Sequence, residues 1–109
     1  MHELAIAESV VDTVTQRLPG VKIACVHLEI GALSGVVSDS VRFCFDLATE
    51  GTGLEGARLE ITEHPAQCRC RSCGSEFSPD MPIVLCPCGS ADVAVLGGEE
   101  LTIVSVQVA

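Results

Sequence analysis

The sequence predicts an α+β fold, in which two helices cover a small sheet of about three strands and a zinc-ribbon-like module is inserted into the chain. Three observations support this prediction: two segments with apolar residues at helical spacing, three segments with the alternation of strands, and five of the seven cysteines within residues 68–88. The cysteine-rich stretch stands between two predicted strands, so both of its ends must return to the same sheet. We therefore expect a discontinuous domain of residues 1–64 and 97–109 and a separate module of residues 65–96.

The first predicted helix covers residues 4–18 and ends at Pro19-Gly20, because proline and glycine both interrupt helices. One face is polar, and the other carries an apolar stripe at spacings of three and four residues. This stripe consists of Leu4, Ala7, Val11, Val14 and Leu18. The first predicted strand follows at residues 21–30. In it, Ala24, Val26, Leu28 and Ile30 alternate with Cys25, His27 and Glu29.

A second helix is predicted from Ser38 onward. Ser38 is expected to cap it, and Asp39 lies in the first turn, where the helix dipole favours negative charge. Its buried stripe is expected to contain Val41, Cys44, Phe45 and Ala48, widened by Phe43 and Leu47. Two further strands are predicted at residues 57–64 and 101–108, and the glycines at 97–98 are expected to form a hinge.

The inserted module has the spacing of a four-thiolate metal site. Cys70 and Cys73 form a CxxCG turn, and Cys86 and Cys88 form a CxCG turn that is one residue tighter. Two close pairs of thiolates suit tetrahedral Zn²⁺, and the glycine after each pair allows the chain to turn back. The residues between the pairs are mostly polar and turn-forming and cannot build a core alone, so the metal is expected to supply the folding energy of the module.

Alternatives remain open for the other cysteines. Cys68 lies two residues before Cys70 and either replaces one of the four ligands or belongs to the strand that leads into the module. A disulfide or a set of unligated thiols is disfavoured, because no feature of the sequence marks secretion. Cys25 and Cys44 lie within apolar patterns and are expected to be packing residues.

Composition limits the classes of function. The chain of 109 residues has a formal net charge of −9 and only three aromatic residues, so it lacks the positive charge and the stacking side chains of nucleic-acid-binding proteins. Arg58, Arg69 and Arg71 could make a small local basic patch. No apolar stretch approaches the roughly 18 residues of a membrane span, and the first residues lack a signal-peptide pattern. We expect a cytoplasmic protein with no nucleic-acid or membrane partner.

The N-terminus, Met1-His2-Glu3, contains donors for a second kind of metal site. The α-amine, the amide nitrogens of residues 2 and 3 and the His2 imidazole can place four nitrogens near one plane, which suits Ni²⁺ or Cu²⁺ rather than structural Zn²⁺. Glu3 either contributes to this site or favours the start of the helix through the dipole. The simpler interpretation is an exposed histidine on a frayed end.

Taken together, these motifs resemble the HypA/HybF family of hydrogenase nickel-incorporation proteins. The matching segments cover nearly the whole chain in the family's order. They are MHE at 1–3, LEIGALSGV at 28–36, SVRFCFDLATEGT at 40–52, GARLEITE at 56–63, CRSCG at 70–74, EFSP at 76–79, CPCGS at 86–90 and GGEELTIVSVQV at 97–108. The sequence departs from the family's usual CPxC at Cys86, where one residue is missing.

The resemblance implies a nickel metallochaperone. By position, His2 matches the nickel ligand and Glu3 is a further candidate for that site. The zinc ligands would be Cys70, Cys73, Cys86 and Cys88. The resemblance also implies delivery of nickel during maturation of [NiFe]-hydrogenase. The implied partners are a nickel-binding maturation GTPase and the precursor of the hydrogenase large subunit.

Other functions fit parts of the sequence. CPxCG turns also hold iron in rubredoxin-like proteins, and a zinc-ribbon module can serve as a structural interaction module. An enzyme is disfavoured, because no nucleophile–base set or carboxylate pair stands out. A site of four cysteines also leaves no open catalytic position.

Overall fold

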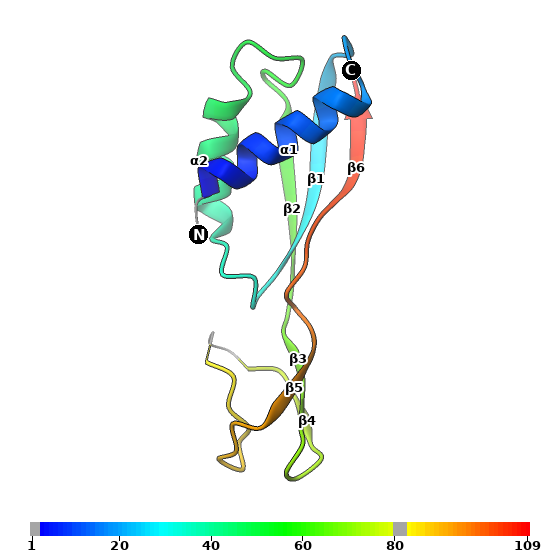
Figure 1. The fold of residues 1–109 in the computed structure, drawn as a ribbon. Coiled ribbons are helices and arrows are strands. Elements are labelled where there is room, and N and C mark those ends of the chain that lie inside the picture. The colour runs from blue at the N-terminus through cyan, green and yellow to red at the C-terminus, as the bar shows by residue number, and fades with distance from the viewer. Residues whose placement is uncertain (1–2, 80–82) are drawn as a thin grey trace.

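The computed structural model describes residues 3–79 and 83–109 of the chain. Within these residues, two helices and six strands form two three-stranded sheets, and the molecule measures 53 × 20 × 18 Å along its principal axes (Figure 1). The elements are α1 (Glu3–Arg17), β1 (Ile23–Gly31), α2 (Ser38–Ala48), β2 (Arg58–His64), β3 (Gln67–Cys70), β4 (Glu76–Phe77), β5 (Val93–Gly97) and β6 (Leu101–Val108). The predicted α+β class is confirmed. Neither described helix is long and apolar enough to cross a bilayer.

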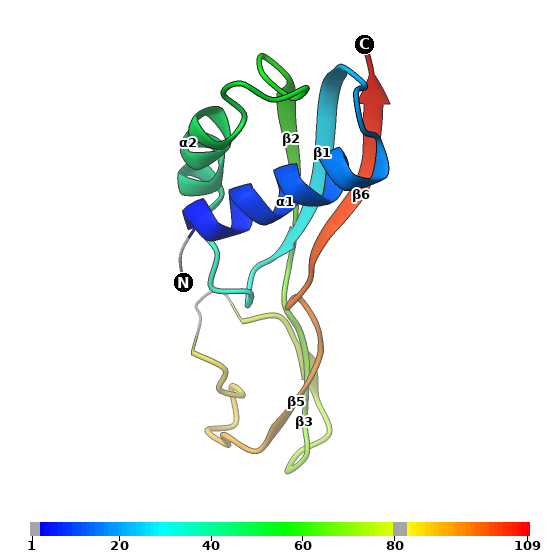
Figure 2. The same ribbon diagram turned by 45° about the horizontal axis from the view of Figure 1, so that its top comes forward.

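The first sheet has the strand order β2-β1-β6, with β1 at its centre. β1 runs parallel to β2 and antiparallel to β6. Parallel neighbours cannot be joined by a tight turn, so the chain must cross over between them, and α2 forms part of this crossover. Both described helices lie on the same face of the sheet (Figures 1 and 2).

The hydrophobic core lies between the helices and this sheet. Val26, Leu28 and Ile30 alternate along β1 and are at most 2% exposed, as expected for a strand that presents one face to the core. Phe45 of α2 is the largest fully buried side chain and belongs to the same cluster. Removal of this apolar surface from water is the main force that holds the layers together.

Helix α1 buries a wider stripe than the predicted one. Ala7 and Val14 are buried as predicted, but Leu4 is 45% exposed, and Ile6 and Val10 are buried in addition. The prediction for Leu4 is wrong because α1 contacts two surfaces. One side of the helix packs on α2, while Ile6 and Val10 face β1 and β6.

The start of α2 also differs from the prediction. Ser38 is the first helical residue and not the cap; the capping position is Val37, whose backbone is extended. The Ser38 hydroxyl bonds the Glu63 carboxylate in β2. The Val37 N–H donates to the Glu3 carboxylate of α1 at 3.4 Å. The predicted serine cap is therefore absent, because the Ser38 hydroxyl bonds a carboxylate in β2 and not a backbone N–H of α2.

The outer face of α2 is more exposed than predicted. Phe43 and Leu47, expected to widen the buried stripe, are 69% and 50% exposed. Val41 and Phe45 are the fully buried hydrophobic residues of the helix, and Cys44 and Ala48 pack beside them partly buried. A single helix that covers one edge of a sheet needs only a narrow apolar stripe.

The second sheet has the order β4-β3-β5, and its neighbouring strands are antiparallel. The chain enters it directly from β2 and returns through β5 into β6 (Figure 1). His64 pairs with Gly31 and Leu101 pairs with Ile30, so the chain leaves and re-enters the first sheet at the same end.

The backbone segments that connect the two sheets are tightly packed. The Gly31 N–H donates to the Glu100 carbonyl at 2.8 Å, and the Leu33 N–H donates to the Gly98 carbonyl at 2.6 Å. A Cβ atom at Gly31 would lie 2.1 Å from the Gly98 carbonyl oxygen, far inside contact distance. Only glycine therefore fits at residue 31 without displacement of the backbone at Gly98, between β5 and β6.

We predict that Gly31→Ala lowers the free energy of unfolding by about 1–3 kcal/mol, because its methyl group overlaps the backbone at Gly98. The measurement is urea denaturation of the metal-loaded protein followed by circular dichroism. Gly97→Ala is the matched control, since nothing lies within 4 Å of its added Cβ, and it should change the free energy by no more than about 0.5 kcal/mol. Equal effects of the two substitutions would contradict the close crossing.

Candidate metal centre

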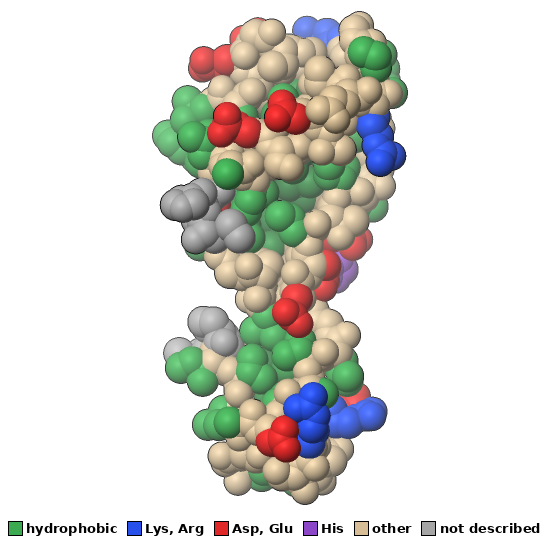
Figure 3. Space-filling model, in the orientation of Figure 1, with side chains coloured by type: hydrophobic (Ala, Val, Ile, Leu, Met, Phe, Trp, Pro, Cys, Tyr) green, Lys and Arg blue, Asp and Glu red, His purple; other side chains and the backbone are tan. Residues whose placement is uncertain are grey.

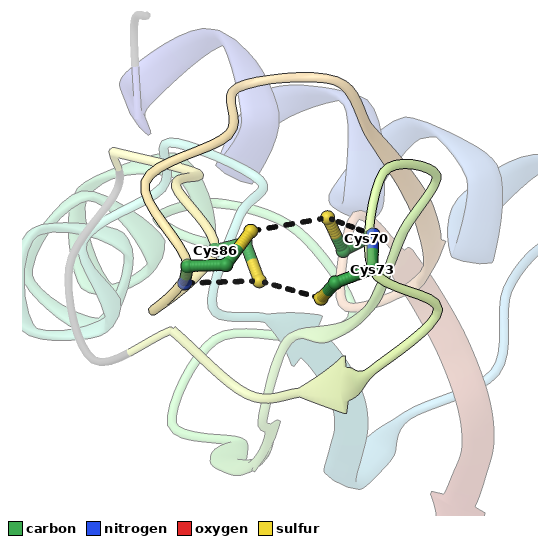
Figure 4. Close-up of side chains that lie close together, drawn as sticks. Cys70, Cys73 and Cys86 are labelled. Atoms are coloured by element: carbon green, nitrogen blue, oxygen red, sulfur yellow. Dashed lines mark hydrogen bonds between the residues drawn. The ribbon is translucent and has the colours of Figure 1, made fainter.

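Four cysteine side chains converge beside the second sheet. Cys70 ends β3, Cys73 follows in the turn to β4, and Cys86 and Cys88 lie in the connection from β4 to β5. All four sulfur atoms lie within 4.8 Å of one another. Cys70 Sγ is 3.7 Å from Cys88 Sγ, and Cys73 Sγ is 3.6 Å from Cys86 Sγ (Figure 4). The two sequence pairs are thus brought together into one cluster.

The spacing of the sulfur atoms fits a tetrahedral ion. Zinc–thiolate bonds of about 2.3 Å imply sulfur–sulfur edges of about 3.8 Å in a regular tetrahedron. The two measured edges, 3.7 and 3.6 Å, come close to this value. Four such ligands complete the coordination of a structural zinc ion and leave no position for a substrate.

Each pair of cysteines is shaped by the same Cys-Gly-Ser turn. Gly74 and Gly89 have φ angles of 78° and 96°, which glycine adopts without strain. Their N–H groups donate to the carbonyl of the first cysteine of the pair, at 2.9 and 2.8 Å. The N–H of that cysteine donates in turn to the carbonyl of Ser75 or Ser90, at 2.8 and 3.0 Å. These serines were not predicted as part of the site, and the repeated CGS triplet is the signal that identifies them.

Hydrogen bonds and burial give Cys70, Cys73 and Cys86 unequal acidity. The Cys73 N–H, which donates to Cys70 Sγ at 3.4 Å, is the main cause that lowers the pKa of Cys70 to about 6. Contacts with Ser75, first through its hydroxyl, lower the pKa of Cys73. The Cys88 N–H acts in the same direction on Cys86, but burial and the neighbouring thiols outweigh it and raise the pKa of Cys86 to about 12. Cys70 and Cys73 therefore ionise first, and a cation is needed before Cys86 can lose its proton at neutral pH.

Polar side chains in and near the site contact one another. Ser72 Oγ lies 2.8 Å from Ser90 Oγ and links one cysteine turn to the other. The three arginines that could make a basic patch each face a carboxylate. These pairs are Arg58–Glu60 at 3.6 Å, Arg69–Glu76 at 2.7 Å and Arg71–Asp92 at 2.9 Å. Their positive charge is therefore locally balanced.

The remaining cysteines lie outside this cluster. Cys68 is in β3, opposite Phe77 and Val95, and is 1% exposed. It occupies the strand that leads into the module, which was one of its two predicted positions. Cys25 is buried in β1, and Cys44 packs against the core between the helices and the first sheet.

Met1 and His2, which carry most of the nitrogen donors of the predicted nickel site, lie outside the described residues. Glu3 is the first residue of α1, and its carboxylate meets the Val37 N–H at the start of α2. A carboxylate is favoured there because the unpaired N–H groups of a helix start carry partial positive charge. Glu3 thus joins the starts of the two helices.

The two described histidines lie apart from the four cysteines. His27 Nε2 is 2.7 Å from the Thr62 hydroxyl, and His64 Nε2 is 3.3 Å from the Glu29 carboxylate. Within residues 3–79 and 83–109, neither belongs to a group of three or more side chains that could hold a metal ion.

Comparison with known proteins gives consistent matches along the chain. The family model described as hydrogenase/urease nickel incorporation, metallochaperone, HypA matches residues 1–108. The hydrogenase maturation factor HypA of Nostoc punctiforme is 47% identical over 108 residues, which cover 99% of this chain and 96% of that protein. The HypA of Geotalea daltonii is 50% identical over 104 residues, with 94% of each chain covered.

Two solved structures share the fold. The solution structure of the nickel metallochaperone HypA from Helicobacter pylori has a TM-score of 0.63 and 22% identity, with 99% of this chain and 97% of that chain covered. A second solution structure of a HypA protein has a TM-score of 0.66 and 23% identity, with 100% and 97% covered. At this identity the likeness supports the fold alone.

We predict that Cys73→Ser reduces the bound structural metal well below one ion per chain, because it removes one of four sulfur ligands. Cys68→Ser is the matched control and should retain the metal, since its sulfur lies outside the cluster. The measurement is metal analysis of purified protein after dialysis. Loss of metal from the Cys68 variant, with retention in the Cys73 variant, would assign the site to a different set of cysteines.

We also predict that zinc affinity falls as the pH is lowered from about 8 to about 6, because protons compete with the metal for thiolates. At neutral pH, binding must release the proton of Cys86, whose pKa is raised, and below about pH 6 it must release that of Cys70 as well. The apparent affinity should weaken about tenfold per pH unit for each proton released. Competition with a zinc-sensitive chelator measures this, and an affinity independent of pH would contradict thiolate ligation.

Proposed function

The chain belongs to the HypA family of hydrogenase/urease nickel-incorporation metallochaperones, and from this membership we propose that it binds Ni²⁺ at its N-terminus and delivers it for maturation of [NiFe]-hydrogenase. The observation that carries the proposal is the match across residues 1–108, which includes Met1-His2-Glu3. In this proposal, nickel is the cargo and His2 is its principal ligand.

The two proposed sets of donor atoms suit different metals. We assign Zn²⁺ to Cys70, Cys73, Cys86 and Cys88, since four sulfurs at tetrahedral spacing match its preference. The α-amine, backbone amides and imidazole at the N-terminus offer nitrogen donors, which suit Ni²⁺. A closed sulfur site retains its ion, whereas ligands at a chain end can be exchanged one at a time with an acceptor.

The contacts of Glu3 suggest how the nickel site is positioned. Its carboxylate meets the Val37 N–H at 3.4 Å, which ties the start of α1 to α2. Glu3 can thus hold the chain that follows His2 in place without being a ligand itself. We propose this positioning role beside the direct role that the sequence allows.

The burial pattern supports a division of the chain into residues 1–64 with 97–109 and a module of residues 65–96. Among the described residues of the module, the buried side chains are Ala66 and three cysteines. No large aliphatic or aromatic side chain is fully buried in that described part. Such a module has too little apolar burial to fold alone, so we propose that metal binding supplies its stability.

The proposed partners follow from the same family membership. They are a nickel-binding maturation GTPase and the precursor of the [NiFe]-hydrogenase large subunit. A net charge of −9 favours an approach to basic partner surfaces or to cations. Seven cysteines without a disulfide fit a reducing compartment, and we place the protein in the cytoplasm. We propose no turnover by the chain itself, since its role is transfer of a bound ion.

We predict that the untagged, zinc-loaded protein binds one Ni²⁺ per chain and that His2→Ala abolishes this binding. A variant with one residue added before Met1 should also lose it, because the α-amine is moved out of register with the imidazole. Calorimetric titration measures both. His27→Ala is the matched control and should bind nickel normally, since His27 bonds Thr62 in the first sheet.

Recovery of hydrogenase activity provides a second measurement of the same prediction. In cells that lack their own family member, the parent chain should restore activity and His2→Ala should not. Equal nickel binding by the parent and both N-terminal variants would remove the N-terminus from the site. Loss of nickel in the cysteine variants alone would then move the cargo to the sulfur cluster.

A further inference from the structure

The start of α2 is held from two sides by carboxylates that come from distant parts of the chain. The Val37 N–H donates to the Glu3 carboxylate of α1 at 3.4 Å. The hydroxyl of the next residue, Ser38, donates to the carboxylate of Glu63 near the end of β2. The starts of α1 and α2 lie side by side in both views of the fold (Figures 1 and 2). The backbone of residues 37–38 therefore links the start of α1 to the first sheet.

The carboxylate of Glu63 is committed to Ser38. Among the described residues, Glu63 forms no ion pair. On the face shown in Figure 3, the visible Lys and Arg side chains lie near the far end of α1 and on the second sheet, away from the helix starts. A hydroxyl that donates to a carboxylate makes a charge-assisted hydrogen bond, which is stronger than a bond between neutral groups. Glu63 thus fixes the orientation of the Ser38 side chain.

The body of α2 is held by other contacts. The Arg42 guanidinium donates to the Leu59 carbonyl of β2 at 2.7 Å, and Phe45 is 1% exposed in the core. By contrast, Val37 at the start of the helix is 58% exposed, so apolar burial contributes little there. The polar contacts of the two carboxylates are therefore the main restraint on the first residues of α2.

We propose that Glu63 is a positioning residue for the nickel site. Through its bond to Ser38 it holds the start of α2, and the start of α2 in turn holds Glu3. Because Glu3 directly follows His2 in the chain, a fixed Glu3 limits the directions available to the ligands that precede it. This inference rests on the proposed nickel function and adds to it a residue of β2 that acts without touching the ion.

The expected effect follows from the cost of ordering a chain end. Ordering of a free segment opposes binding, because it removes conformational freedom. Contacts that order the neighbouring residue before the ion arrives lower this cost. Loss of a group that orients a metal ligand typically weakens metal binding about 10- to 100-fold. Since Glu63 acts through Ser38 and Glu3 in series, we expect a smaller loss, of about three- to tenfold.

Calorimetric titration of Ni²⁺ into the untagged, zinc-loaded protein tests this role. Glu63→Ala should weaken nickel binding about three- to tenfold, with no change in the bound zinc or in the circular dichroism of the protein. Ser38→Ala should weaken it to the same extent. The double variant should be no weaker than either single variant, because the two residues act through one bond.

Arg42→Met is the matched control. It removes the other polar contact between α2 and β2 and keeps an apolar side chain of similar length. Since this contact lies along the body of the helix and not at its start, the variant should bind nickel like the parent. A loss of nickel affinity equal to that of Glu63→Ala would overturn the proposal, because it would show only that α2 must be attached to the sheet.

Glu63→Gln separates positioning from charge. Its amide oxygen can still accept a hydrogen bond from Ser38, but the negative charge is gone. It should bind nickel within about twofold of the parent, and a loss as large as that of Glu63→Ala would overturn the positioning role. A parent that binds no nickel would overturn both the proposed function and this inference. Normal binding by the parent and by Glu63→Ala would overturn this inference alone.

Discussion

Parallel pairing of β1 with β2 is the constraint on which the rest of this structure depends. Parallel neighbours require a crossover, and α2 supplies it, which brings Phe45 over the sheet to close the core. The same pairing places Gly31 and His64 together at one end of the two strands. β6 is antiparallel to β1 and begins at that end, where Leu101 pairs with Ile30. Everything between β2 and β6 must therefore leave and return at one point.

This arrangement explains why the metal-binding module has to be stabilised separately. Its two connecting segments pass a crossing so close that residue 31 has no room for a side chain. Beyond the crossing, β3, β4 and β5 form a sheet that does not share the core of the helical layer. The buried side chains of the module are mostly cysteines, whereas large apolar side chains are buried between the helices and the first sheet. A tetrahedral ion bound to four thiolates can replace the missing hydrophobic burial.

The same topology separates three features of the chain. The starts of α1 and α2 meet through Glu3 and Val37 on the β2 side of the molecule. The sulfur cluster lies in the second sheet, and the uncharged edge of β6 faces away from α2.

Local patterns in the sequence determined the fold class, the strands β1, β2 and β6, the two helices and the pairing of Cys70 and Cys73 with Cys86 and Cys88. These features depend on periodicity and spacing, which a sequence states directly. The motifs also identified the family. Tertiary packing alone decided that α1 buries Ile6 and exposes Leu4, that the Ser38 hydroxyl bonds Glu63 instead of capping α2, and that Cys68 remains in β3. Each of these depends on which elements meet in space, and contacts between residues far apart in the chain leave no periodic trace in it.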